Sequence, residues 1–192
     1  VKLLKRKKSF KLVREEFALI DTKPSFLFVD IFAEDNAYED EQGRKYRKEW
    51  CQKYRELCLK NFDLNMKYFA SLKKEEFDKE LNKFLSIHKA FEEIHNLNEC
   101  AKMEGYYLLI LDEYKQGYIG KSCDIKRRIM QHWSNVKSFD RVLLPFYGVE
   151  SSCFSIDFFR AFDTTRIYVW EKEIREGIEE ELVESFPKKY QL

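Results

Sequence analysis

The stretch GYYLLILDEYKQGYIGKSCDIKRRIMQH, residues Gly105–His132, decides the fold of this chain. It contains two runs rich in aromatic and branched apolar residues, Tyr106–Leu111 and Gly117–Gly120. Polar residues between these runs suit a hairpin turn. A helix is expected to follow, beginning near Ser122 or Asp124. The stretch therefore predicts a β-hairpin joined directly to a helix.

The hairpin register predicts where its tyrosines lie. If the turn is symmetric about Asp112 and Glu113, antiparallel pairing places Tyr107 directly opposite Tyr118. Their Cβ atoms would then be about 4.5–5.5 Å apart on one face of the sheet. A slip of one residue would send one of the side chains to the other face.

The following helix has an apolar stripe with a polar edge. Ile125, Ile129 and Trp133 recur at helical spacing, so this face is expected to be buried. Arg128 and His132 stand at positions i and i+4 and share one edge of the stripe. We expect both side chains to face a site at the end of the hairpin.

Composition predicts a soluble, cytoplasmic protein. The net charge of the 192 residues is only +1, so overall charge indicates no partner. Five scattered cysteines without a C-x-x-C pair favour reduced thiols over disulfides or a zinc site. No apolar run approaches the length of a membrane span. Positive charge is nevertheless concentrated in a basic arm and in a second cluster: Lys2, Lys5, Arg6, Lys7 and Lys8, and Lys121, Lys126, Arg127, Arg128, Lys137 and Arg141.

The sequence changes character near residue 100. Residues 1–100 are predicted to form a mostly helical accessory region, with a short strand at Phe26–Phe32, a helix from Lys45 to about Leu72, and a second helix capped by Ser71. One apolar face of that second helix is expected to consist of Phe77, Leu81, Phe84, Leu85, Phe91 and Ile94. His88 and His95 lack ligand partners at a suitable spacing and are interpreted as face or core residues.

Residues 101–192 are predicted to form a second domain. Beyond the hairpin and its helix, Val142–Phe146 and Arg166–Trp170 are expected to be strands, with Pro145 placing the first at an edge or a strand end. The predicted fold class is α+β, a small and mainly antiparallel sheet flanked by helices.

Three segments together resemble the signature of the GIY-YIG nuclease superfamily. They are Gly105-Tyr106-Tyr107, then Tyr118-Ile119-Gly120-Lys121-Ser122, then Arg128 followed four residues later by His132. A fourth segment, Ile178-Glu179 with Leu182 and Val183, resembles the family's third helix. The superfamily includes homing endonucleases, restriction enzymes and repair nucleases. The resemblance implies a Mg²⁺-dependent (or Mn²⁺-dependent) DNA endonuclease.

The resemblance also implies a role for each residue. Tyr107, Tyr118, Arg128, Lys121 and His132 would be catalytic. Glu179 would be the metal ligand, with Glu180 and Glu181 as rivals for that role. The basic residues Lys126, Arg127 and Lys137 would contact nucleic acid.

The residue types fit phosphodiester hydrolysis. An ordinary tyrosine has a pKa of about 10, so ionising it at neutral pH costs roughly 4 kcal/mol. Cations such as Lys121 or Arg128 are expected to lower that pKa by about 1–3 units. The planar guanidinium of Arg128 suits a phosphate, and one carboxylate such as Glu179 suits Mg²⁺, which keeps several waters. Which tyrosine takes the proton stays open; we favour Tyr107, with Tyr118 orienting water or phosphate.

Two other functions remain alternatives. The first is a nucleic-acid-binding module that has lost cleavage, because family members usually carry an Asn after the last helix and none follows Glu179 here. The second is a partner-dependent subunit whose N-terminal helical region binds a protein. Taken singly, the tyrosines are typical packing residues, and the Glu179–Glu181 run is typical of a solvated helix face. Their joint order and spacing favours the nuclease.

Overall fold

A computed structural model describes residues 11–19, 36–135, 137–143 and 148–192. Within these residues the chain divides into two compact units. The sheet unit comprises residues 11–12, 66–135 and 154–192, and the hairpin unit comprises the other described residues. Both contain helices and antiparallel strands, which confirms the predicted α+β class.

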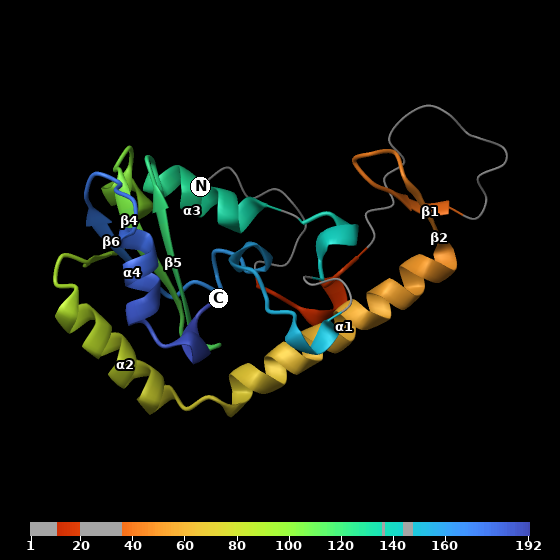
Figure 1. Cartoon of the computed structure of the whole chain (residues 1–192), viewed down its shortest axis with the longest axis horizontal. Coiled ribbons are helices and arrows are strands. Elements are labelled where there is room, and N and C mark those ends of the chain that lie inside the picture. The colour runs from red at the N-terminus through yellow and green to blue at the C-terminus, as the bar shows by residue number, and fades with distance from the viewer. Residues whose placement is uncertain (1–10, 20–35, 136, 144–147) are drawn as a thin grey trace. The chain divides into compact units, whose positions relative to one another are not determined.

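The sheet unit is built on a four-stranded antiparallel sheet (Figure 1). Its strand order is β3 (Glu92–Ile94), β6 (Arg166–Glu171), β4 (Gly105–Leu111) and β5 (Gln116–Ser122). β4 and β6 are therefore central, and β3 and β5 are the edge strands of the described sheet. The strands predicted from Tyr106, from Gly117 and from Arg166 are confirmed as β4, β5 and β6.

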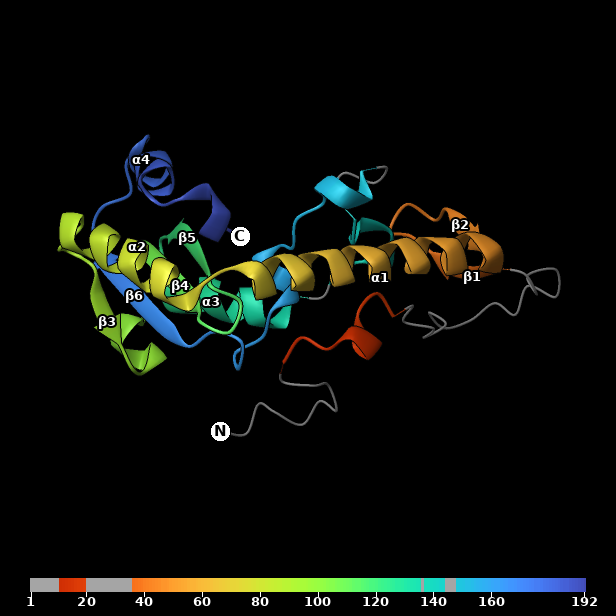
Figure 2. The same cartoon turned by 90° about the horizontal axis from the view of Figure 1, so that it is seen from below.

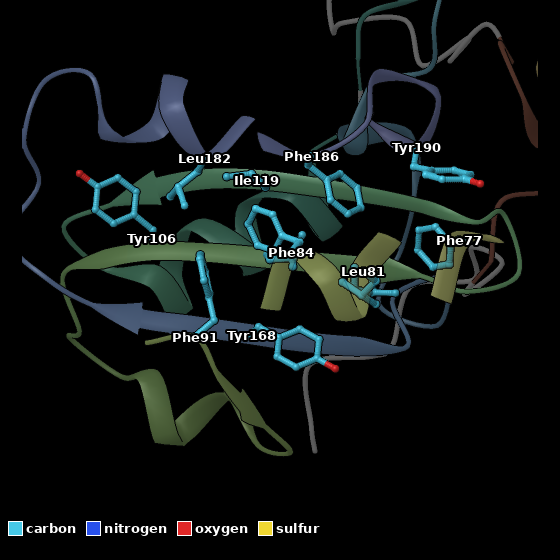
Figure 3. Close-up of a cluster of buried hydrophobic side chains, with 12 residues drawn as sticks. Phe77, Leu81, Phe84, Phe91, Tyr106, Ile119, Tyr168, Leu182, Phe186 and Tyr190 are labelled. Carbon is cyan, nitrogen blue, oxygen red and sulfur yellow. The ribbon is translucent and has the colours of Figure 1, made fainter. Parts of the chain in front are cut away.

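Two helices cover one face of this sheet. Alternate residues of β4 point to this face, and they pack against α2 (Lys74–Ile87) and α4 (Ile178–Ser185). Figure 3 shows the resulting core, in which Phe84 and Phe186 meet edge to face with ring centroids 5.5 Å apart. The buried cluster consists of Phe77, Leu81, Phe84, Phe91, Tyr106, Leu108, Ile110, Ile119, Tyr168, Leu182, Phe186 and Tyr190.

The opposite face of the sheet is covered by α3 (Ile125–Ser134). The side chain of Asp124 caps this helix by accepting a hydrogen bond from the Arg127 backbone N–H, as its predicted start requires. Ile125 and Ile129 are fully buried. Trp133 was expected on the buried face of α3 but is only half-buried, whereas His132, expected at the edge of that face, is 1% exposed.

The hairpin unit contains β1 (Asn36–Glu39), β2 (Lys45–Arg47) and the first part of α1 (Lys48–Ser71), which runs on into the sheet unit (Figure 2). Trp50 stacks on Tyr54 with ring centroids 4.8 Å apart. The side-chain amide of Asn61 donates to the carbonyls of Val149 and Ser152. Aromatic packing and this buried amide hold the unit together.

The expected mostly helical N-terminal region is wrong. Besides α1 and α2, residues 36–100 contain β1, β2 and β3. α2 ends at Ile87 because His88 leaves the helical conformation, so Phe91 and Ile94 do not extend its apolar face. Phe91 still reaches the core from the following turn, while Ile94 pairs with Ile167 in the sheet. Sheet pairing thus overrides a continuous apolar periodicity.

Other local predictions also change. Ser71 does not cap α2: its hydroxyl donates back to the carbonyl of Tyr68, and Lys73 is the N-cap residue. Val142 and Leu143 lie in a bend rather than a strand, and the rest of that predicted strand lies outside the described residues. The strand predicted at residues 26–32 also lies outside them. Among the described helices, none is both long and apolar enough to cross a membrane.

Candidate active site

The two signature tyrosines lie on the α3 face of the hairpin. The register places Tyr107 opposite Gly120 and Tyr118 opposite Leu109, so the predicted direct pairing of the tyrosines is wrong by two residues. The turn spans the four residues 112–115 because Leu111 pairs with Gln116, so it is two residues longer on its C-terminal side than the predicted loop of Asp112 and Glu113. A shift of two residues keeps each side chain on its face. The rings are therefore diagonal neighbours, with centroids 6.2 Å apart.

The glycines of the two motifs make room for this arrangement. A Cβ atom on Gly120 would lie 2.6 Å from both the Cζ and the hydroxyl oxygen of Tyr107. A Cβ atom on Gly105, whose φ is +152°, would lie 2.1 Å from the backbone oxygen of Trp170. Gly120 lets the Tyr107 ring lie across β5, and Gly105 lets β4 approach β6.

A buried chain of polar groups links Tyr107 to two residues from other elements. The Tyr107 hydroxyl lies 2.8 Å from Nε2 of His132, and Nδ1 of His132 lies 2.7 Å from Oδ1 of Asp157. Tyr107 is 0% exposed and His132 is 1% exposed. The His132 ring also meets the half-buried Tyr118 ring edge to face at 5.1 Å. Both imidazole nitrogens are thus engaged in a site that largely excludes water.

Arg128 supplies positive charge to the same group. Taken alone, its guanidinium acts to lower the pKa of both tyrosines, which is the direction that the sequence predicted for a nearby cation. Burial acts in the opposite direction and is the larger effect, so the pKa of Tyr107 is raised well above its ordinary value. The pKa of Tyr118 is also raised, by burial first and then by the carboxylates of Glu179 and Asp157. Both phenols are therefore neutral at physiological pH in this conformation.

Lys121 and Glu179 form a second group around the β5 edge. Lys121 pairs with Tyr106 in the register, so its side chain leaves the strand on the α2 and α4 face. Its Nζ lies 2.9 Å from Oε2 of Glu179 and 3.8 Å from Oε1 of Glu180. Glu179 is linked to the first group only through its charge, which raises the pKa of Tyr118. The six predicted residues thus divide into two groups on either side of β5.

The hydroxyl of Tyr106 is bound by the loop that precedes α4. It donates to the carbonyl of Arg175 and accepts the backbone N–H of the same residue. These bonds hold the loop that leads into α4. Gly177 then turns the chain with a φ of +84° just before the helix that carries Glu179.

The predicted nucleic-acid contacts are dispersed. Lys126 is half-buried, and its Nζ donates to the side-chain oxygen of Asn98 at 2.6 Å. Arg127 is exposed on α3, one residue from Arg128. Lys137 belongs to the hairpin unit and is half-buried there.

Asp157 is the site residue that sequence reasoning missed. It lies in the single-turn 3₁₀ helix Ile156–Phe158, 25 residues after His132, within the segment SIDFF. An acidic residue between apolar ones is a weak signal on its own. Only a predicted contact between this segment and α3 would have identified it.

Comparisons of the chain with protein families, curated proteins and solved structures found no match.

Proposed function

We propose that the protein is a Mg²⁺-dependent (or Mn²⁺-dependent) endonuclease of the GIY-YIG type that hydrolyses DNA phosphodiester bonds. The observation that carries this proposal is the buried bond between Tyr107 and His132, with Arg128 acting on the same tyrosine. These residues come from the first and third segments of the signature, and packing alone does not need an ionisable partner for a buried phenol.

The different burial of the two tyrosines supports different roles for them in our proposal. Tyr118 is half-buried and Tyr107 is fully buried, so Tyr118 is the phenol that meets the attacking water. Each phenol affects the pKa of the other, which indicates a polar coupling between them. In our proposal Tyr118 passes the proton of the water to Tyr107, and Tyr107 passes its own proton to Nε2 of His132.

This relay removes a difficulty raised by the pKa shifts. Because burial holds both phenols neutral, neither tyrosine is a ready base at neutral pH. A neutral imidazole nitrogen is a far stronger base than the oxygen of a neutral phenol. His132 therefore provides the basicity, and the tyrosines provide the path to it.

Arg128 is proposed to bind the scissile phosphate. It stands on the half-exposed edge of α3, close enough to act on both phenols. A guanidinium donates two parallel hydrogen bonds to phosphate oxygens and stabilises the charge that develops during attack. Substrate phosphate would thereby lie next to Tyr118.

Glu179 fits the role of a metal ligand. Its carboxylate is half-buried and neutralised by the ammonium of Lys121, so a cation already occupies the position beside it. Among the described residues no three metal-ligating side chains lie together, so Glu179 would hold the ion with water and phosphate oxygens. A bound Mg²⁺ would stabilise negative charge on the phosphate and the leaving oxygen.

Cleavage of supercoiled plasmid tests the proposal. Wild-type protein is incubated with Mg²⁺, with Mn²⁺ or with EDTA, beside folded Arg128→Ala and Glu179→Gln variants. We expect metal-dependent nicking that both substitutions abolish. No cleavage of plasmid, branched or single-stranded DNA by folded wild-type protein would contradict the nuclease. Salt-dependent DNA binding without cleavage would then support the binding module.

A further inference from the structure

The carboxylate of Asp157 is held firmly against His132. The backbone N–H of Asp157 donates to the hydroxyl of Ser155, and the backbone carbonyl of Asp157 accepts a hydrogen bond from the guanidinium of Arg160 at 2.8 Å. Arg160 also binds the carbonyl of Phe159 at 2.9 Å. The short helix that carries Asp157 is thus fixed from both sides, and its side chain points Oδ1 at the imidazole.

This contact restricts the proton on the imidazole. A neutral imidazole carries one proton, on either Nδ1 or Nε2. An ionised carboxylate is only an acceptor, so its 2.7 Å bond to Nδ1 requires the proton to be there. Nε2 is then left as an acceptor, facing the Tyr107 hydroxyl at 2.8 Å.

We propose that Asp157 is a positioning residue that fixes the Nδ1–H tautomer of His132, so that Tyr107 can transfer its proton to Nε2. The proton moves from the Tyr107 oxygen to Nε2, which breaks the O–H bond and forms an N–H bond. Tyrosinate and imidazolium result, and the tyrosinate takes the proton arriving from Tyr118. Asp157 stabilises the imidazolium through the bond at Nδ1. The role in proton transfer depends on the nuclease function proposed above.

Among the described residues, the groups that contact His132 are consistent with this direction of transfer. Tyr107 and Tyr118 approach the ring from the sheet and Asp157 from the 3₁₀ helix, while Arg128 acts on both tyrosines from the preceding turn of α3. Of these, Asp157 is the acidic group in direct contact with the ring. The carboxylate stabilises the protonated ring, while Arg128 favours the tyrosinate on the other side of Tyr107.

The tautomer is measurable in the free protein. The ring nitrogens of ¹⁵N-labelled full-length protein distinguish the two tautomers by NMR, and the chain has only three histidines. His132→Gln assigns the signals, and His88 and His95 serve as internal references. We expect wild-type His132 to carry its proton on Nδ1. In Asp157→Asn the amide can donate to Nδ1, so the Nε2–H form should become populated.

Asp112→Asn is the matched control. The Asp112 side chain is 23% exposed, close to the 25% of Asp157, but it accepts hydrogen bonds from the Thr165 hydroxyl and the Arg166 guanidinium instead. Its loss should leave the His132 signals unchanged. A proton on Nε2 of His132 in the wild type would overturn the proposal, and this result needs no variant. Identical His132 signals in the wild type and in folded Asp157→Asn would also overturn it.

Single-turnover cleavage supplies the functional readout. We expect Asp157→Asn to slow cleavage about 10²–10⁴-fold, the usual contribution of acid–base catalysis, without loss of DNA affinity. The Asp157→Asn/His132→Gln double variant should be no slower than His132→Gln, because both act at one step. Multiplicative losses would overturn the positioning role. Absence of wild-type cleavage would contradict the nuclease proposal alone, because the NMR measurement uses neither DNA nor metal.

Discussion

Tyr106 and Tyr107 are adjacent in β4, and both are 0% exposed, yet they serve different faces of the sheet. Tyr106 belongs to the apolar core, and its hydroxyl is satisfied by the backbone of Arg175. The hydroxyl of Tyr107 is instead bound to the ionisable ring of His132. Burial does not separate a packing tyrosine from a site tyrosine, whereas the chemical nature of the hydroxyl's partner does.

The two faces of the sheet extend this contrast. The face under α2 and α4 is packed with aromatic and aliphatic side chains. The face under α3 encloses an imidazole and a phenol in contact, with a guanidinium and a carboxylate at their edge. Burying such groups is costly unless they are paired, so their presence on one face supports our proposal that the proton relay lies there. Substitutions on the two faces should therefore have separable effects on stability and activity.

The largest effect on stability is expected on the core face. Phe84 is 1% exposed and packs against Phe91 and Phe186. Phe84→Ala should lower the free energy of unfolding by about 3–5 kcal/mol, because it leaves a cavity. Ile87 lies on the same helix but is 61% exposed, so Ile87→Ala should change it by less than about 0.5 kcal/mol. Equal losses in urea denaturation would contradict the assigned core.

On the α3 face, Arg128→Ala should reduce activity rather than stability. Loss of a donor to the developing charge is expected to slow cleavage about 10²–10³-fold. Arg127 is the control because it is exposed on the same helix. Arg127→Ala should only weaken DNA binding, lowering the salt slope by about 1. Single-turnover rates at saturating DNA measure the difference, and similar rates for the two variants would remove Arg128 from the reaction.

A smaller effect is expected from the ion pair around the β5 edge. Lys121 and a bound metal ion would compete for the carboxylate of Glu179. Lys121→Met should therefore tighten Mn²⁺ or Mg²⁺ binding, by no more than about fivefold, since a partly exposed ion pair contributes at most about 1 kcal/mol. Lys126→Met, which removes a contact with Asn98 instead, should leave metal affinity unchanged. Calorimetric titration without DNA measures both, and weaker binding by Lys121→Met would contradict the competition.

The smallest effect is expected from alkaline pH. Burial raises the folded-state pKa of Tyr107 and Tyr118 above the value of about 10 in an unfolded chain. The resulting stabilisation is complete below about pH 10 and is lost as pH rises above it, because the unfolded state releases its protons first. The melting temperature should fall over this range, and less steeply in Tyr107→Phe. Tyrosinate absorbance near pH 10 that develops before unfolding in the wild type and is reduced in Tyr107→Phe would contradict the buried site.

Much of the sheet unit could be predicted from the sequence. The hairpin, α3 with its Asp124 cap, and β6 follow from periodicity and from capping residues, whereas α4 was expected only from the family resemblance. The face shared by Tyr107 and Tyr118 was also correct, because the register error was an even number of residues. Local patterns were sufficient for these features because they depend on neighbouring residues.

Predictions that depended on distant contacts were less successful. The strand β3 exists because β6 pairs with it from more than seventy residues away, and nothing local separates it from a continuing helix. Asp157 meets His132 only through the tertiary fold. The net pKa of both tyrosines is raised, although a lowering was expected. The reason is again tertiary: nearby cations can be identified in the sequence, while burial cannot.

The comparison of the two tyrosines leads to one direct measurement, metal-dependent plasmid nicking by Tyr107→Phe and Tyr106→Phe. Each variant loses a single buried hydroxyl from adjacent positions of β4. We predict that Tyr107→Phe abolishes nicking while remaining folded. Tyr106→Phe should keep most of its activity and lose about 1 kcal/mol of stability, the contribution of a typical hydrogen bond. Wild-type nicking that survives in Tyr107→Phe as well as in Tyr106→Phe would contradict the assignment of the α3 face as the active site.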